Sequence, residues 1–260
     1  MTDTGYYLYG IIKNMPLADN IPGLDSRGSV FVIPFNDLAG IVSTVNLAEF
    51  GEVPLKQNLE SLDWVREKVF GHERVIEAVM KQTAVIPMKF CTIFNSRERI
   101  LELLEKKCDF FIKLLEAYSD KREWGIKIYE SIKSELSAKP AASGREYLKL
   151  KKAQQDTALE HERRVNTMVE KIFKKINSLA ESSRINRPTP KELLPHKDKE
   201  QILNASFLVL ESKEKELSKL VDETARQYSE EGLTVELIGP LPVYSFITSN
   251  SQGISNGNDN

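Results

Sequence analysis

The sequence predicts an α+β protein with two domains, each built from a mainly antiparallel sheet with helices. Two features of the chain lead to this prediction. Short runs rich in β-branched and aromatic residues alternate with longer segments whose apolar residues recur every three or four positions, as in buried strands and amphipathic helices. The length of 260 residues is enough for two modest domains. A short charged stretch at 119–122 marks the predicted boundary, with one domain over 1–120 and the other over 121–247.

The first domain is predicted to contain three strands, a helix, a further strand and a second helix. The pair Asn36–Asp37 favours a turn between the second and third strands. Pro87 lies inside the fourth predicted strand and indicates an edge or a bend there. The predicted strands are 6–12, 30–34, 40–45 and 84–94, and the predicted helices are 62–82 and 96–118.

The second domain is predicted to follow the order strand, helix, loop, strand, helix, strand. This order is close to a split βαβ, or ferredoxin-like, layout, in which an antiparallel sheet carries helices on one face. Residues 181–199 contain three prolines and many charges and are predicted to form a mobile loop, and residues 248–260 a disordered tail. The predicted strands are 123–129, 202–211 and 233–239, and the predicted helices run from 143 to about 180 and from 212 to 232.

The first of these helices is unusually long. Ser143 and Glu146 form an S-x-x-E capping box at its start, and almost no Gly or Pro follows up to residue 180. A continuous helix of that length measures roughly 55 Å. Apolar residues are sparse in its first half, so part of it is expected to project into solvent. Its basic residues indicate either a solvated face or a binding surface: Lys149, Lys151, Lys152, Arg163 and Arg164.

Composition excludes several classes of protein. The chain has 36 Lys and Arg residues against 38 Asp and Glu residues, a formal net charge of −2, which argues against a nucleic-acid coat protein or a polybasic membrane anchor. It contains no apolar run of about 18 residues, as a membrane span requires, and its N-terminus does not resemble a signal peptide. Two cysteines are too few for a disulfide framework or a structural zinc site. A soluble, cytoplasmic protein is therefore expected.

Catalytic and cofactor motifs are absent from the sequence. No zinc-binding, phosphate-binding or nucleophile-elbow pattern occurs, so we expect no enzyme activity, no cofactor and no metal. His72 and His161 lie on apolar helix faces and are expected to be core histidines satisfied by neighbours, whereas His196, in the proline-rich loop, is expected to be solvated. Cys91 is expected to be a small buried residue and not a nucleophile.

Aromatic residues instead concentrate near the ends of predicted strands, for example Tyr9, Phe90, Tyr244 and Phe246. Core packing explains most of them, but strand edges bearing such side chains can also accept an extended or helical apolar partner. The residues alone thus predict a two-domain α+β protein that binds a partner and does not catalyse a reaction.

Six segments, in order, resemble the gas vesicle protein L/F family. They are YLYGI (7–11), HERVIE (72–77), VIPMKFCTIF (85–94), EWGIK (123–127), GREYLKLKK (144–152) and GPLPVYSF (239–246). Cys91 stands where the family typically has a glycine, and Leu241 and Val243 replace a usual Trp and Pro. The resemblance covers nearly the whole chain except its tail.

The resemblance implies an accessory protein of gas vesicle formation, without catalytic residues. Gas vesicles are protein-walled, gas-filled compartments that give cells buoyancy, and their wall is built from a small, very hydrophobic protein. Members of the family are similar in having two α+β domains, the second ferredoxin-like. They are thought to contact the wall protein and other accessory proteins early in assembly, which implies a location at the gas vesicle or in the cytoplasm.

A partner-binding surface is our hypothesis for the aromatic and proline residues. We expect these residues to frame or support it: Tyr9, Phe90, Pro240, Pro242, Tyr244 and Phe246. The same residues can instead serve only to pack the sheets. Two other functions stay open at this point, a small-ligand sensor or enzyme built on the ferredoxin-like domain, and a minor structural component of the vesicle. The sequence does not distinguish an L-type from an F-type member.

Overall fold

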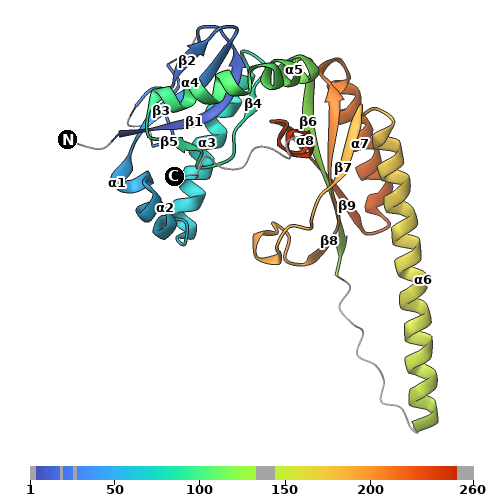
Figure 1. Ribbon diagram of the computed structural model, residues 1–260. Helices are drawn as coiled ribbons and strands as arrows, with labels where there is room; N and C mark the ends of the chain where they lie inside the picture. The colour runs from blue at the N-terminus through green and yellow to red at the C-terminus, as the bar shows by residue number, and fades with distance from the viewer. Residues whose placement is uncertain (1–3, 18–19, 26–27, 133–143, 251–260) are drawn as a thin grey trace. The chain divides into compact units, whose positions relative to one another are not determined.

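The computed structural model describes residues 4–17, 20–25, 28–132 and 144–250 (Figure 1). The chain forms two compact units. One contains the residues up to Glu123 together with those from Pro240 onward, and the other contains Trp124–Gly239. This division differs from the predicted one at the C-terminus, where residues 240–247 pack in the first unit and not in the second. Residues 251–260 of the expected tail lie outside the described residues, whereas 248–250 continue a helix.

The sheet of the first unit is centred on β1 (Thr4–Lys13), which pairs antiparallel with β3 (Leu38–Asn46), β4 (Ile86–Pro87) and β5 (Ile93–Phe94). β2 (Phe31–Phe35) pairs with β3 across the predicted turn at Asn36. Gly40 lies close to Leu8 and to Ile100 of helix α4 (Arg97–Lys106). Tyr7 and Tyr9 pack with helix α3 (Leu62–Met80) on the opposite face. Both faces of β1 are covered, so its sequence is an almost unbroken apolar run.

Six helices of the described residues belong to this unit. Their bounds are α1 (Leu47–Phe50), α2 (Glu52–Asn58), α3 (Leu62–Met80), α4 (Arg97–Lys106), α5 (Cys108–Tyr118) and α8 (Tyr244–Asn250). The predicted helix over 62–82 is confirmed as α3. The predicted helix over 96–118 is instead α4 and α5, because Lys107 leaves the helical conformation between them. Gly71 lets α3 approach the backbone of Leu24, since a Cβ there would lie 2.4 Å from the Leu24 carbonyl oxygen.

The predicted strand over 84–94 is two short strands, β4 and β5, joined by a turn. Cys91 in this turn has a φ of 61°, in the left-handed region that is costly for a residue with a Cβ. Its N–H donates to the Tyr7 hydroxyl at 2.9 Å, which holds the turn against β1. A glycine at this position, as is typical of the family the sequence resembles, relieves that strain.

We therefore expect Cys91→Gly to be more stable than Cys91→Ala by about 1 kcal/mol. Both variants lose the thiol, but only alanine keeps the Cβ that the left-handed backbone disfavours. Urea denaturation of the two variants measures the difference. Equal stabilities, or a more stable alanine variant, would contradict the prediction.

The second unit has the element order β-α-β-β-α-β. Its members are β6 (Lys121–Ser131), α6 (Gly144–Asn177), β7 (Ser182–Ile185), β8 (Lys199–Leu210), α7 (Glu214–Ser229) and β9 (Leu233–Leu241), with 3₁₀ turns at Lys191–Leu193 and Glu211–Lys213. The sheet order is β7-β8-β6-β9, with β7 antiparallel to β8. This element order corresponds to a split βαβ layout, while the ferredoxin-like assignment stays a prediction.

Helices α6 and α7 lie on one face of this sheet (Figure 1). The buried residues between them come from both helices and from three of the strands, for example Ile126, Ile172, Phe207 and Leu217. The segment predicted as a loop over 181–199 contains strand β7, which was not predicted. The coarse prediction is confirmed: both units combine helices with a sheet, and every strand pair with a described register is antiparallel.

Helix α6 is exposed over its first half. The described side chains of α6 up to Glu160 are exposed, and the first buried one is Val165, so the predicted projection of its first half is confirmed. Ser143 of the expected capping box lies outside the described residues.

No helix within the described ranges combines the length and apolar character needed to cross a bilayer.

Candidate partner-binding site

The C-terminal motif is anchored in the first unit by hydrogen bonds from its first helical turn. The Tyr244 hydroxyl lies 2.8 Å from Nε2 of His72 on α3. The backbone N–H and the hydroxyl of Ser245 both donate to the buried Glu123 carboxylate, at 2.9 and 2.5 Å. Pro242, Phe246 and the neighbouring apolar residues are buried in the same unit. These contacts join residues more than 120 positions apart and attach the C-terminal motif to α3 and to the start of β6.

His72 is the centre of a hydrogen-bonded chain. The Tyr244 hydroxyl donates to Glu73 Oε1 at 3.2 Å, so it accepts the bond from His72 Nε2–H. On the other side of the ring, Nδ1 lies 2.9 Å from the Tyr7 hydroxyl. In a neutral ring with its proton on Nε2, Nδ1 accepts, so the Tyr7 hydroxyl donates to it while accepting from the Cys91 N–H. Burial favours this neutral form of His72.

Burial favours the uncharged forms of the groups in this hydrogen-bonded chain. It lowers the pKa of His72 to about 4, against a backbone hydrogen bond with Met88 that raises it. Burial also raises the pKa of Tyr9 to about 12 and that of Tyr7 and Tyr244 well above the ordinary value. The pKa of Glu73 is raised by burial as well, against the hydrogen bond from Tyr244. At neutral pH the imidazole and the three tyrosines of the cluster are therefore uncharged.

Aromatic rings surround His72 on three sides. Tyr9 stacks on the imidazole with centroids 5.8 Å apart, and Tyr7 and Phe90 meet it edge-on at 5.6 and 5.9 Å. The Tyr9 hydroxyl bonds Ser43 Oγ at 2.7 Å and accepts from the Leu24 N–H at 2.7 Å. The expectation that His72 is a core histidine satisfied by its neighbours is confirmed.

The structure gathers three of the six predicted site residues around His72, namely Tyr9, Phe90 and Tyr244. Tyr9, Pro242 and Phe246 are buried, Phe90 and Tyr244 are half-buried, and Pro240 is exposed and does not join the cluster. Most of these side chains therefore lie beneath a surface and not on it. Sequence reasoning did not connect His72 with Tyr244, because no local pattern links positions 172 apart.

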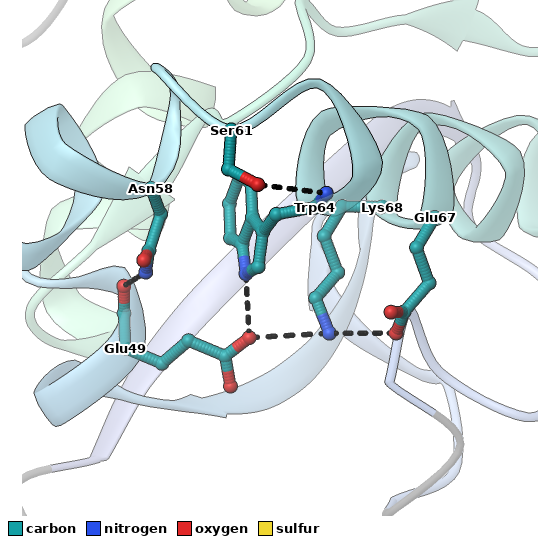
Figure 2. Close-up of polar contacts among 6 residues, drawn as sticks. All are labelled: Glu49, Asn58, Ser61, Trp64, Glu67 and Lys68. Atoms are coloured by element: carbon teal, nitrogen blue, oxygen red, sulfur yellow. Dashed lines mark hydrogen bonds and ion pairs between the residues drawn. The ribbon is translucent and has the colours of Figure 1, made fainter.

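The start of α3 is braced by a second polar cluster, which was also not predicted (Figure 2). The Lys68 ammonium is buried and lies 3.1 Å from carboxylate oxygens of both Glu49 and Glu67. Trp64 donates its indole N–H to Glu49 at 2.9 Å, and the ammonium lies 5.8–5.9 Å from the rings of Phe50 and Trp64. Burial alone would lower the pKa of Lys68, but the hydrogen bonds to Glu67 and Glu49 raise it. The lysine is thus held as a cation that ties α3 to α1.

The outer side of α2 and α3 exposes apolar side chains. Leu62 is 77% exposed and Phe70 is 69% exposed, although both belong to the helix that the two clusters hold in place. Val53 and Leu59, on α2 and at its end, are exposed as well. Single exposed apolar residues are ordinary on protein surfaces, whereas contiguous apolar patches mark interaction sites. These four side chains lie within residues 53–70 and are our candidate for such a site. We call Val53, Leu59, Leu62 and Phe70 the α3 surface.

Three further features of the described residues concern ligand and metal binding. A small hollow beside Tyr118, Arg122 and Pro242 holds about 10 Å³, room for one water molecule and far below the roughly 300 Å³ of a small ligand site. No three His, Cys, Asp or Glu side chains in the described part of the chain are grouped to hold a metal ion. Burial raises the pKa of the Cys91 thiol to about 12, so the thiol stays protonated.

The two histidines of the second unit are both paired. His161 Nε2 lies 2.5 Å from Glu130 Oε1, so the histidine is satisfied by a neighbour, but its side chain is 34% exposed. The expectation that His161 is a core residue is therefore wrong. The expectation that His196 is merely solvated is wrong, because its Nε2 lies 2.6 Å from Glu236 Oε1 and its ring packs edge-on against Tyr129 at 5.1 Å. The loop that carries His196 is therefore attached to the sheet by this pair.

Comparisons with known proteins agree with the resemblance seen in the sequence. A family model described as gas vesicle synthesis protein GvpL/GvpF matches residues 5–248. Gas vesicle protein L of Streptomyces sp. (strain CB03234) is 30% identical over 256 residues, which cover 94% of this chain and 93% of that protein.

Two solved structures share the fold. The gas vesicle protein GvpF from Anabaena sp. PCC7120 superposes with a TM-score of 0.69 at 21% identity, covering 94% of this chain and 95% of the other. GvpF from Microcystis aeruginosa gives a TM-score of 0.67 at 20% identity, covering 93% and 98%. From the family match over nearly its whole length, this chain belongs to the gas vesicle protein GvpL/GvpF family.

Proposed function

We propose that this chain is a non-catalytic accessory protein that binds the hydrophobic wall protein of the gas vesicle early in assembly. Membership of the GvpL/GvpF family supports a role in gas vesicle formation. The observation that carries the binding function is the α3 surface, with Leu62 and Phe70 exposed on a helix that is buried and hydrogen-bonded on its inner side.

The physical need for such a partner follows from the wall protein itself. A subunit hydrophobic enough to line a gas space exposes apolar surface before it is assembled and tends to aggregate. An amphipathic helix with exposed apolar residues can cover part of that surface. The many charges of this chain, 36 basic and 38 acidic residues, keep such a complex in solution.

The predicted site residues have a supporting role in this proposal. Tyr9, Phe90 and Tyr244 contact His72 on the inner side of α3, and Phe246 belongs to the same anchored helix α8. They keep α3 in one position while its outer side contacts the partner. A preformed surface binds more tightly than one that must be ordered on binding.

A pull-down of the purified wall protein with the full chain tests the proposal. We expect the double variant Leu62→Ser with Phe70→Ser to retain at least fivefold less wall protein than the wild type, because it removes two apolar contacts. Leu193→Ser is the matched control, since Leu193 is 66% exposed on a 3₁₀ turn of the second unit. An unrelated aggregation-prone peptide measures non-specific retention.

The outcomes of the pull-down test the α3 surface, the C-terminal motif and wall-protein binding separately. Equal loss in the double variant and in Leu193→Ser would contradict the assignment to the α3 surface. Unchanged retention by Tyr244→Ala with Phe246→Ala, in a protein that still folds normally, would remove the supporting role of the C-terminal motif. If the wild type retains neither the wall protein nor the unrelated peptide, wall-protein binding is contradicted. A role through contact with other accessory proteins would then remain.

A further inference from the structure

The first half of α6 exposes its side chains in the part of the chain that the structure describes. All thirteen side chains from Leu148 to Glu160 are exposed, and the helix extends beyond the sheet of its own unit (Figure 1). The pair His161–Glu130 marks where it leaves the unit. Isolated helices of about this length are marginal in water. A helix of this kind is stabilised when another element covers it.

Two exposed leucines lie on one face of this segment. Leu148 is 66% exposed and Leu159 is 50% exposed, and they are eleven residues apart, which is about three turns. Eleven residues bring a helix back to within about 20° of its starting direction. Lys152 and Gln155 lie between them on the same stripe at the 4-3-4 spacing that a helix pair uses. The stripe therefore has an apolar residue near each end and a polar centre.

Apart from Glu146, the charges between residues 145 and 162 are ordered from basic to acidic. Arg145 and Lys149 lie near the N-terminal end of the segment, whereas Asp156 and Glu162 lie in its C-terminal part. A second copy in the antiparallel direction, centred between residues 153 and 154, brings Leu148 opposite Leu159. The same register brings Arg145 opposite Glu162 and Lys149 close to Asp156, each twice by the two-fold symmetry. A parallel pair would bring like charges together.

We propose that two copies of this chain associate through residues 145–162 of α6 as an antiparallel helix pair. The charge order selects the second copy as the occupant, because the segment is complementary to itself in this direction. Only two leucine layers contribute apolar contact, so the dimer is weak and depends on concentration and salt. This self-association is independent of the binding function proposed for the α3 surface.

Charge reversal tests the register directly. Sedimentation equilibrium of the full chain over a concentration series should show a monomer–dimer equilibrium. Lys149→Glu and Asp156→Lys should each weaken the dimer at least tenfold, since each places two like-charged pairs in contact. The combined variant Lys149→Glu with Asp156→Lys restores both opposite-charge pairs and should return to within about threefold of the wild type. An equimolar mixture of the two single variants should associate in the same way.

Lys171→Glu is the matched control, an exposed lysine on α6 outside the segment, and should leave the dimer unchanged. Circular dichroism confirms that each variant keeps its helix content. A wild type that stays monomeric at all concentrations would overturn the proposal. Association that ignores the single reversals, or a combined variant as weak as the single ones, would show contact elsewhere or in another register and overturn it as well.

Discussion

Replacing His72 with alanine is expected to lower the free energy of unfolding of the first unit by about 3–4 kcal/mol. The change removes a fully enclosed ring that contacts Tyr7, Tyr9 and Phe90, and cavities of this kind cost about 2–5 kcal/mol. It also leaves the hydroxyls of Tyr7 and Tyr244 each without one hydrogen-bond partner. Denaturation followed by Trp64 fluorescence in a Trp124→Phe background measures the first unit.

The C-terminal segment provides a second readout for the same variant. If His72 fixes Tyr244, then the amide hydrogens of Phe246 and Ile247, which bond the Val243 carbonyl, should exchange faster with solvent in His72→Ala. Tyr244→Phe keeps the ring and removes only the hydroxyl, so we expect a smaller loss of about 1–2 kcal/mol. A cost below about 1.5 kcal/mol for His72→Ala, with unchanged exchange at Phe246, would contradict the central role of the imidazole.

Regular elements with a strong apolar period were predictable from the sequence. Helix α3 was predictable, because its apolar residues recur with the helical period over five turns. Strand β7 (Ser182–Ile185) was not predictable, since its four residues are mostly polar and exposed. They form a strand only because β8 offers a free edge for pairing. The break between α4 and α5 at Lys107 has no Gly or Pro to mark it.

The candidate site was only partly predictable for a related reason. The aromatic character of Tyr9, Phe90 and Tyr244 was visible, but their common contact with His72 depends on tertiary structure. Lys68 shows the limit most clearly, because a lysine on a helix is ordinarily solvated. Its burial depends on Glu49 and Trp64, which reach it from other positions. The family resemblance supplied what the residues alone did not, namely the connection to gas vesicles.

Acidification should destabilise the first unit through His72. In the unfolded chain this histidine binds a proton near pH 6.5, whereas in the folded chain its pKa is lowered to about 4. Between these values the unfolded state binds more protons, so stability falls as the pH falls. The loss attributable to His72 is about 2 kcal/mol at pH 5 and approaches about 3 kcal/mol near pH 4, at 1.36 kcal/mol for each pKa unit. It is absent above about pH 7.

The contribution of Glu73 to the pH dependence of stability must be separated from that of His72, because the two contributions have opposite signs. Burial raises the pKa of Glu73 in the folded state, so its protonation favours folding as the pH falls. Stability should therefore be measured between pH 7 and 4 in the wild type, His72→Gln and Glu73→Gln. We expect the fall with acid to be shallower in His72→Gln and steeper in Glu73→Gln than in the wild type. An NMR titration of the His72 imidazole with a midpoint near 6.5, together with parallel stability curves for the wild type and His72→Gln, would show that the folded structure accepts the charged ring. The hydrogen-bonded chain through Tyr7 and Tyr244 would then need a different arrangement of protons.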